Sequence, residues 1–96
     1  MAVEHIVWIK FNEGVSEERA NEHIANLLTL KDRVPGVTRV TAGKNFTERS
    51  KGFTHALVVT LEDKAALDAY LPHPEHVAVA APMKAEAELM AIDFEY

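Results

Sequence analysis

The run from Val3 to Phe11 carries apolar side chains at both odd and even positions. Its odd positions are apolar except for one histidine, and its even positions include Ile6 and Trp8. Because successive side chains of a strand point to opposite faces, the run predicts a strand covered on both sides. The segment from Phe53 to Leu61 has the same character, since neither of its faces is plainly polar.

A helix is predicted between these two strands by apolar residues at helical spacing. Ser16 is a typical N-cap residue, and the two glutamates after it suit the positive end of a helix dipole. The helix should end near Arg33, because Pro35 restricts the backbone of the residue before it. A weaker strand from Val37 to Ala42 and a long polar loop then lead, as a hairpin, to the strand at Phe53–Leu61.

Further helices and a short strand complete the pattern. Asp63 can cap a helix that ends at Pro72. The alanine-rich stretch from Val77 to Met90 is predicted to be helical, with a bend at Pro82. The residues from Ile92 to Tyr96 form a last short strand.

The order of these elements, β-α-β-β-α-(α)-β, is typical of a ferredoxin-like fold in the α+β class. Four antiparallel strands then carry the helices on one face, within one domain of residues 1–96. The face away from the helices carries Ile6, Trp8, Ala56 and Val58. Burying a large apolar side chain contributes roughly 1.5–3 kcal/mol. Because symmetric pairs are the most common oligomers, we expect a homodimer that packs sheet to sheet.

Charge and composition exclude several kinds of partner. Lys and Arg number 10 against 15 Asp and Glu, a net charge of −5, which argues against nucleic acid. There is no cysteine, which excludes disulfides and thiolate chemistry and suits a reducing compartment. We also see no apolar stretch that could span a membrane and no signal-peptide layout. These features predict a cytoplasmic protein.

Four side chains suited to proton transfer are predicted to meet on the helix-covered face. His5 and His55 share the parity of the buried residues of their strands, and Tyr70 and His76 lie on the segment that covers them. A histidine can take up a proton near neutral pH, and a phenol can donate a hydrogen bond to an oxyanion. Proton abstraction next to a carbonyl group is therefore feasible.

Each of these residues also has a structural interpretation. A histidine on an apolar face often only hydrogen-bonds a backbone carbonyl, and Tyr70 can simply pack its ring in the core. His73 and His76 are three residues apart, but a closed metal site needs about four ligands, and the sequence does not place the others. His73 is then a cap or turn residue. We expect no metal, and without a glycine-rich phosphate loop we expect no cofactor.

Several motifs are shared with a known family: His5-Ile6-Val7, Pro35-Gly36-Val37, Gly52-Phe53-Thr54-His55-Ala56 and Tyr70-Leu71-Pro72-His73-Pro74-Glu75-His76. With these motifs in this order, the chain resembles the stress-responsive dimeric α/β barrel (Dabb) family over essentially its whole length. The resemblance implies two four-stranded sheets that face each other in a dimeric barrel. It agrees with the apolar outer face.

The family includes plant stress proteins, a plant polyketide cyclase and many bacterial members without a settled activity. The resemblance to the cyclase implies that His76 is a general base and that Tyr70 orients a substrate carbonyl. It places His5 and His55 at two further strand histidines. Leu27 stands where the cyclase has an aromatic residue, so its substrate is not carried over.

Two hypotheses follow for the function. In the first, the protein is an enzyme for a small carbonyl or polyketide-like compound, with His76 and Tyr70 as catalytic residues. The residues expected to bind the substrate are His5, His55, Leu27, Phe53 and His73. In the second, it is a non-catalytic stress-response protein that binds a hydrophobic ligand or serves in assembly. Both need a small apolar ligand or a second copy of the chain as partner.

Overall fold

One antiparallel sheet of four strands forms the frame of the molecule, in the order β2-β3-β1-β4. The computed structural model describes all residues, Met1–Tyr96. The strands are β1 (Val3–Phe11), β2 (Val37–Lys44), β3 (His55–Leu61) and β4 (Ala87–Glu95). The strands with two apolar faces, β1 and β3, are the central pair, which is where such strands are expected.

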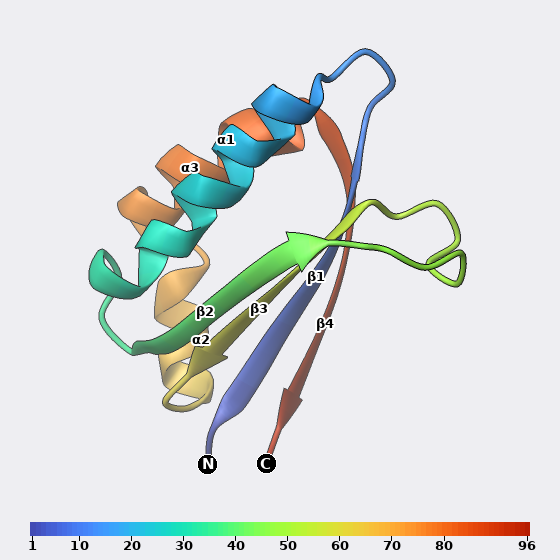
Figure 1. The fold of residues 1–96 in the computed structure, drawn as a ribbon. Helices are drawn as coiled ribbons and strands as arrows, with labels where there is room; N and C mark the ends of the chain where they lie inside the picture. The colour runs from blue at the N-terminus through green and yellow to red at the C-terminus, as the bar shows by residue number, and fades with distance from the viewer.

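All helices lie on one face of this sheet (Figure 1). They are α1 (Glu17–Leu28), the short 3₁₀ helix η1 (Thr29–Asp32), α2 (Lys64–Tyr70) and α3 (Pro74–Lys84). The predicted ferredoxin-like α+β arrangement is confirmed. The helices and the sheet enclose the core, while the other face of the sheet is bare in the single chain.

The helices begin at the predicted polar caps. The Ser16 side chain accepts a hydrogen bond from the Arg19 amide at 3.0 Å, and Asp63 accepts one from the Ala66 amide at 2.8 Å. The first helix ends earlier than predicted. The Thr29 hydroxyl donates to the carbonyl of Asn26 at 2.7 Å, and the chain tightens into η1 there.

The sequence also favours Pro74 as a first helical position, and this is confirmed, whereas the predicted extension of the helix to Met90 is wrong. Helix α3 begins at Pro74 and ends at Lys84, and the last strand begins at Ala87 instead of Ile92. Strand β4 pairs with β1 along its full length, from Phe11↔Ala87 to Val3↔Glu95. The ladder of hydrogen bonds along β1 outweighs the helix propensity of a few alanines, since propensity is a weak preference that tertiary pairing overrides.

The core follows the alternation of β1 and β3. Val7, Ile9 and Val59 lie beneath the helices, with Leu27 of α1 packed on them. Trp8 points the other way and is 40% exposed. The expected separation of an inner, helix-covered face from an outer apolar face is therefore present.

Gly36 fixes the distance between α2 and the start of β2. Its φ angle is +90°, a conformation that side-chain-bearing residues rarely adopt. A Cβ atom at this position would lie 2.8 Å from the Cβ of Ala66 in α2. The close approach therefore requires a residue without a side chain.

Candidate active site

A cleft of about 250 Å³ lies between the sheet and the helices. Val7, Leu27 and Met83 are among its apolar walls, which come from both layers of the fold. Four polar residues also line it, and they are His5, Tyr70, His76 and Lys84. A small apolar enclosure with a few polar groups is the usual form of a ligand site.

Tyr70 is the central polar residue of this cleft. It ends α2 and is 0% exposed, and its ring lies 4.2 Å from the His76 ring and 5.8 Å from the His5 ring, centroid to centroid. Burial raises the pKa of its phenol above the usual value, so the hydroxyl keeps its proton at neutral pH. This hydroxyl has no hydrogen-bond partner within the chain. It is a buried donor without a partner, in a residue that lines the cleft.

His76 has one ring nitrogen occupied and one free. Its Nδ1 lies 3.0 Å from the carbonyl oxygen of Leu71. Because a carbonyl only accepts hydrogen bonds, Nδ1 carries the hydrogen and Nε2 holds the lone pair. Burial lowers the pKa of the imidazole below its ordinary value, which keeps it neutral near pH 7. His76 is thus in the form that accepts a proton.

His5 is held by a carboxylate that the sequence alone did not reveal. Its Nδ1 is bonded to an Oδ1 atom of Asp93, which lies directly opposite His5 in the β1–β4 pairing. His5 is buried, whereas Asp93 is exposed. The register of β1 against β4 would have indicated this contact, because it pairs His5 with Asp93. That register could not be predicted while the start of β4 was placed at Ile92.

Leu27 is the second predicted binding residue that lies in the cleft, but three others lie elsewhere. His55 is buried at the other end of the inner face, with its Nδ1 2.9 Å from the Thr54 hydroxyl. Burial lowers its pKa. His73 caps α3, since its Nδ1 accepts a hydrogen bond from the Glu75 amide at 3.1 Å. Neither histidine lines the cleft.

The predicted position of Phe53 on the helix-covered face is wrong. Strand β3 begins only at His55, after a turn in which Gly52 has a φ angle of +90°. This turn places the Phe53 ring edge-on against Trp8, with centroids 5.6 Å apart, at the outer face. Strand alternation cannot be extended into such a turn, because the period of two holds only for extended backbone.

A second group of rings, which the sequence analysis missed, fills the space beside α1. His23 is 2% exposed, and its ring stacks on Phe11 with centroids 5.7 Å apart. Its Nε2 is 3.3 Å from Glu86, close enough for an ion pair but not aligned as a hydrogen bond. Arg19 binds the same carboxylate at 3.0 Å and lowers its pKa. His23 does not line the cleft.

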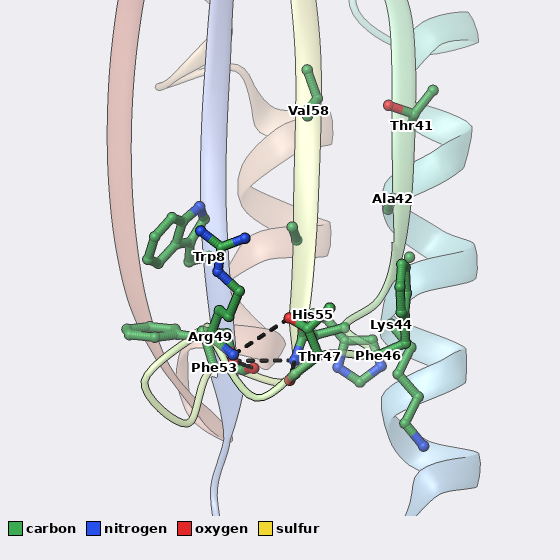
Figure 2. Close-up of a pocket in the computed structure, with 14 residues that line it drawn as sticks. Trp8, Thr41, Ala42, Lys44, Phe46, Thr47, Arg49, Phe53, His55 and Val58 are labelled. Carbon is green, nitrogen blue, oxygen red and sulfur yellow. Dashed lines mark hydrogen bonds between the residues drawn. The ribbon is translucent and has the colours of Figure 1, made fainter.

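The outer face of the sheet has a broad hollow of about 570 Å³ at the loop that joins β2 and β3. Figure 2 shows Trp8, Thr41 and Val58 on the side of the strands away from the helices. Phe46, at the rim, is 95% exposed. The hollow is open and shallow, and it lacks the enclosed character of the inner cleft.

No three His, Asp or Glu side chains are grouped so as to hold a metal ion. No helix has the length and apolar character needed to cross a bilayer.

Comparison with known proteins places the chain in a family. The family described as "Stress responsive A/B Barrel Domain" matches residues 3–96. The chain belongs to this family. Among A/B barrel proteins, olivetolic acid cyclase from Cannabis sativa is 31% identical over 98 residues, which span 100% of this chain and 96% of the cyclase. The family expected from the sequence motifs is confirmed.

Two solved structures show how closely the A/B barrel fold is shared. The Arabidopsis thaliana protein At3g17210 has a TM-score of 0.90 at 28% identity and covers 98% of this chain and 94% of its own. A protein from Jannaschia sp. CCS1, described as a dimeric ferredoxin-like protein of unknown function, has a TM-score of 0.85 at 28% identity and covers 100% of both chains. Within this family, the fold is constant and the chemistry must be argued from the cleft.

Proposed function

We propose that the cleft binds a small apolar compound with a carbonyl group, and that His76 removes a proton from the carbon next to it. The observation that supports this most directly is the buried Tyr70 hydroxyl, which has no hydrogen-bond partner and belongs to a ring 4.2 Å from the His76 ring, centroid to centroid. An unpaired buried donor is costly, so a ligand acceptor would satisfy it. The similarity to a protein named as a cyclase supports carbonyl chemistry.

The proposed step is balanced within the cleft. The C–H bond breaks, its proton goes to Nε2 of His76, and its electron pair forms an enolate. The Tyr70 hydroxyl donates a hydrogen bond to the enolate oxygen, which carries the negative charge. The protonated His76 then returns the proton to carbon or oxygen. Alternatively, the enolate carbon attacks a second carbonyl of the same molecule, the π electrons of that carbonyl move to its oxygen, and this oxygen takes the proton from His76. Asp93 holds the His5 ring in place on the other side of Tyr70.

Exchange of hydrogen for deuterium next to a ketone tests this step without knowledge of the natural substrate. Octan-2-one is incubated with the protein in D₂O, and the loss of its α-hydrogen signals is followed by NMR. We expect exchange above the rate in buffer with wild type, and His76→Ala should abolish that excess. Melting should change little, because the His76 ring is only part-buried.

A second histidine on the same turn provides the control. His73→Asn keeps a side chain that can cap α3 and lies outside the cleft, so exchange should be unchanged. If wild type gives no exchange, or if His76→Ala exchanges as fast as wild type, the base is not His76. A ketone bound unaltered, seen by native mass spectrometry, would then favour the non-catalytic hydrophobic-ligand hypothesis.

We also infer that two copies pack their outer faces together. Strand β4 carries an exposed apolar ridge formed by Met90, Ile92 and Phe94 at one edge of the sheet. The hollow over β2 and β3 lies toward the other edge and has the small residues Gly43 and Ala56 in its lining. A two-fold axis between the sheets and along the strands places each ridge over the partner's hollow. Each large side chain so buried contributes roughly 1.5–3 kcal/mol.

This assembly can be tested from both sides of the contact. Ile92→Lys changes the ridge and Ala56→Glu changes the hollow, and each should convert a dimer to folded monomer in analytical ultracentrifugation at micromolar concentration. Val77→Lys is the matched control, because Val77 is a similarly exposed apolar residue on the helix side. A wild-type monomer, or dissociation by Val77→Lys alone, would contradict the proposed contact. The similarity to a protein described as dimeric supports it.

A further inference from the structure

One positive charge at the cleft has no partner. Lys84, the last residue of α3, lines the cleft together with Tyr70 and His76. Its ammonium group takes part in none of the ion pairs or side-chain hydrogen bonds of the chain. By contrast, Arg19 and Arg33 on the same face of the molecule are bound to glutamates at 3.0 and 2.7 Å.

The cleft contains no negatively charged residue that could form an ion pair with Lys84. None of its 12 lining residues is an Asp or a Glu. The nearby carboxylate of Asp93 is occupied by His5. In a chain with a net charge of −5, this leaves an isolated region of positive potential. Lys84 is an exposed residue that also lines the cleft. An anion whose apolar part occupies the cleft is therefore held beside this charge, and the apolar walls on one side strengthen their interaction.

The positive charge of Lys84 acts on His76, the proposed base. After burial, it is among the causes that lower the pKa of the His76 imidazole. The ammonium group and the base therefore act on the same small volume. A ligand whose carbonyl contacts Tyr70 and His76 within the cleft has its remaining atoms near this cation.

We propose that Lys84 makes the cleft selective for a carboxylate: a small compound with an apolar body, one carbonyl at Tyr70 and His76, and an ionised acid group at Lys84. This inference rests on the proposed function and names its substrate class. The cavity of about 250 Å³ is slightly below the usual size of ligand pockets, so the body is short. Apolar residues such as Leu27 and Leu57 hold that body.

A purely structural role for Lys84 makes a different prediction. A lysine in the last turn of a helix interacts favourably with the helix dipole. That role affects the stability of α3 but gives no preference between a charged and a neutral ligand. Discrimination by ligand charge therefore separates the two roles.

Octanoate and octanamide form a matched pair for this test, since they have the same chain and differ in charge. Binding to the full chain is measured by calorimetric titration at pH 8 and low salt, where His76 is neutral with or without Lys84. We expect wild type to bind octanoate about tenfold more tightly than octanamide. Lys84→Met should remove this preference while leaving the affinity for octanamide unchanged, which shows that the cleft is intact.

Two lysine variants complete the design. Lys84→Arg keeps the positive charge and should keep the preference for octanoate. Lys31→Met removes an exposed lysine of η1, outside the cleft, and should change neither affinity. The preference of wild type should also weaken as salt is added, because a partly exposed charge is screened.

Failure of this inference is distinguishable from failure of the proposed base. Equal affinity of wild type for octanoate and octanamide, or a preference that survives in Lys84→Met, overturns the role of Lys84. Exchange of the neutral ketone octan-2-one needs His76 but not Lys84. Intact exchange without charge preference would reject only the carboxylate, and charge preference without exchange would reject only the base.

Discussion

Two groups of rings lie in the inner layer of this protein. One of them faces the enclosed cleft, whereas the other meets only the open outer hollow, through His55. At one end, Tyr70 stands between His5 and His76 beside the cleft. At the other end, Phe11 lies between His23 and His55, and His23 lines neither the cleft nor the outer hollow. Both ends hold two histidines and one aromatic ring. Residue type alone therefore does not distinguish a candidate site from a packed core.

The partners of the polar atoms do distinguish the two ends. His23 Nε2 makes no aligned hydrogen bond, but it has the Glu86 carboxylate at ion-pair distance, 3.3 Å, and His55 lies against the Thr54 hydroxyl. The Tyr70 hydroxyl has neither a hydrogen-bond partner nor a charged group at that distance. An unpaired group next to an empty volume indicates a ligand, whereas a paired group in filled space indicates stability.

The largest expected effect is a loss of stability at the filled end. His23→Ala leaves a cavity beneath Phe11 and should lower the free energy of unfolding by about 2–4 kcal/mol. His76→Ala, at the cleft, should cost about 1 kcal/mol or less, because its ring already borders empty space. Urea unfolding at one fixed protomer concentration compares them. Equal losses would remove the distinction between the two ends.

Adding volume should reverse the order of tolerance. Ala20 is buried in α1 and lines neither the cleft nor the outer hollow, so Ala20→Leu should overpack the core and cost about 1–3 kcal/mol. Ala80 is buried in α3 and lines the cleft, so Ala80→Leu should change the free energy of unfolding by about 1 kcal/mol or less. It should also prevent octanamide from binding. Calorimetric titration of the Ala80 variant checks this, and retained affinity would mean that ligands bind elsewhere.

Asp93, the partner of His5, and Glu86, the partner of His23, should differ in their effect on deuterium exchange. Asp93→Asn weakens the hold on His5 and should slow deuterium exchange about tenfold, because small misplacements of groups around a reacting centre are costly. Glu86→Gln alters the equivalent partner of His23 and should leave exchange unchanged. NMR exchange rates on both variants, with melting curves as a check on folding, decide between them. A slower rate only in Glu86→Gln would reverse the assignment.

The smallest expected effect is in the dependence on pH. Burial lowers the pKa of both His55 and His76 below the ordinary 6.5. Above pH 6.5 both are neutral in the folded and unfolded states, and as pH falls below this value the unfolded chain binds more protons. Stability is therefore lost as pH falls from 6.5 through the lowered folded pKa values. Exchange should also decline with a midpoint below 6.5.

Substitutions of the two histidines separate their contributions to the loss of stability and of exchange at low pH. His55→Gln should flatten the slope of stability against pH while leaving the acid limb of exchange in place. His76→Gln should flatten the same slope and abolish exchange. Urea unfolding and NMR exchange over a series of pH values measure both quantities. An exchange midpoint above 6.5 would contradict a buried, neutral His76.

Much of the fold could be read from the sequence because alternation and caps are local signals. Spacing within a few residues is enough to predict several features, namely strand β1, the caps Ser16 and Asp63, and the outward direction of Trp8. The start of β4 did not follow, because it depends on pairing with a strand almost the whole chain away. Local propensity carries no information on that pairing.

The candidate site could be predicted only in part for the same reason. Parity placed His5 on the helix-covered face, and the Tyr70–His76 segment was expected above it, as the structure shows. His55 shares the parity of His5 but lies along the strand, at the filled end. Whether a histidine meets a void or a neighbour depends on volumes contributed by three helices, and one-dimensional spacing does not contain them.

The glycine at position 36 links the backbone of a distant turn to the chemistry of the cleft. Its missing side chain lets the helix that ends in Tyr70 come within reach of the sheet, since even one methyl group there would strike Ala66. A larger residue at this position would push α2 away from the sheet and move the Tyr70 phenol away from the His5 and His76 rings. The position of the Tyr70 hydroxyl therefore depends on the absence of a side chain at Gly36, in another part of the chain.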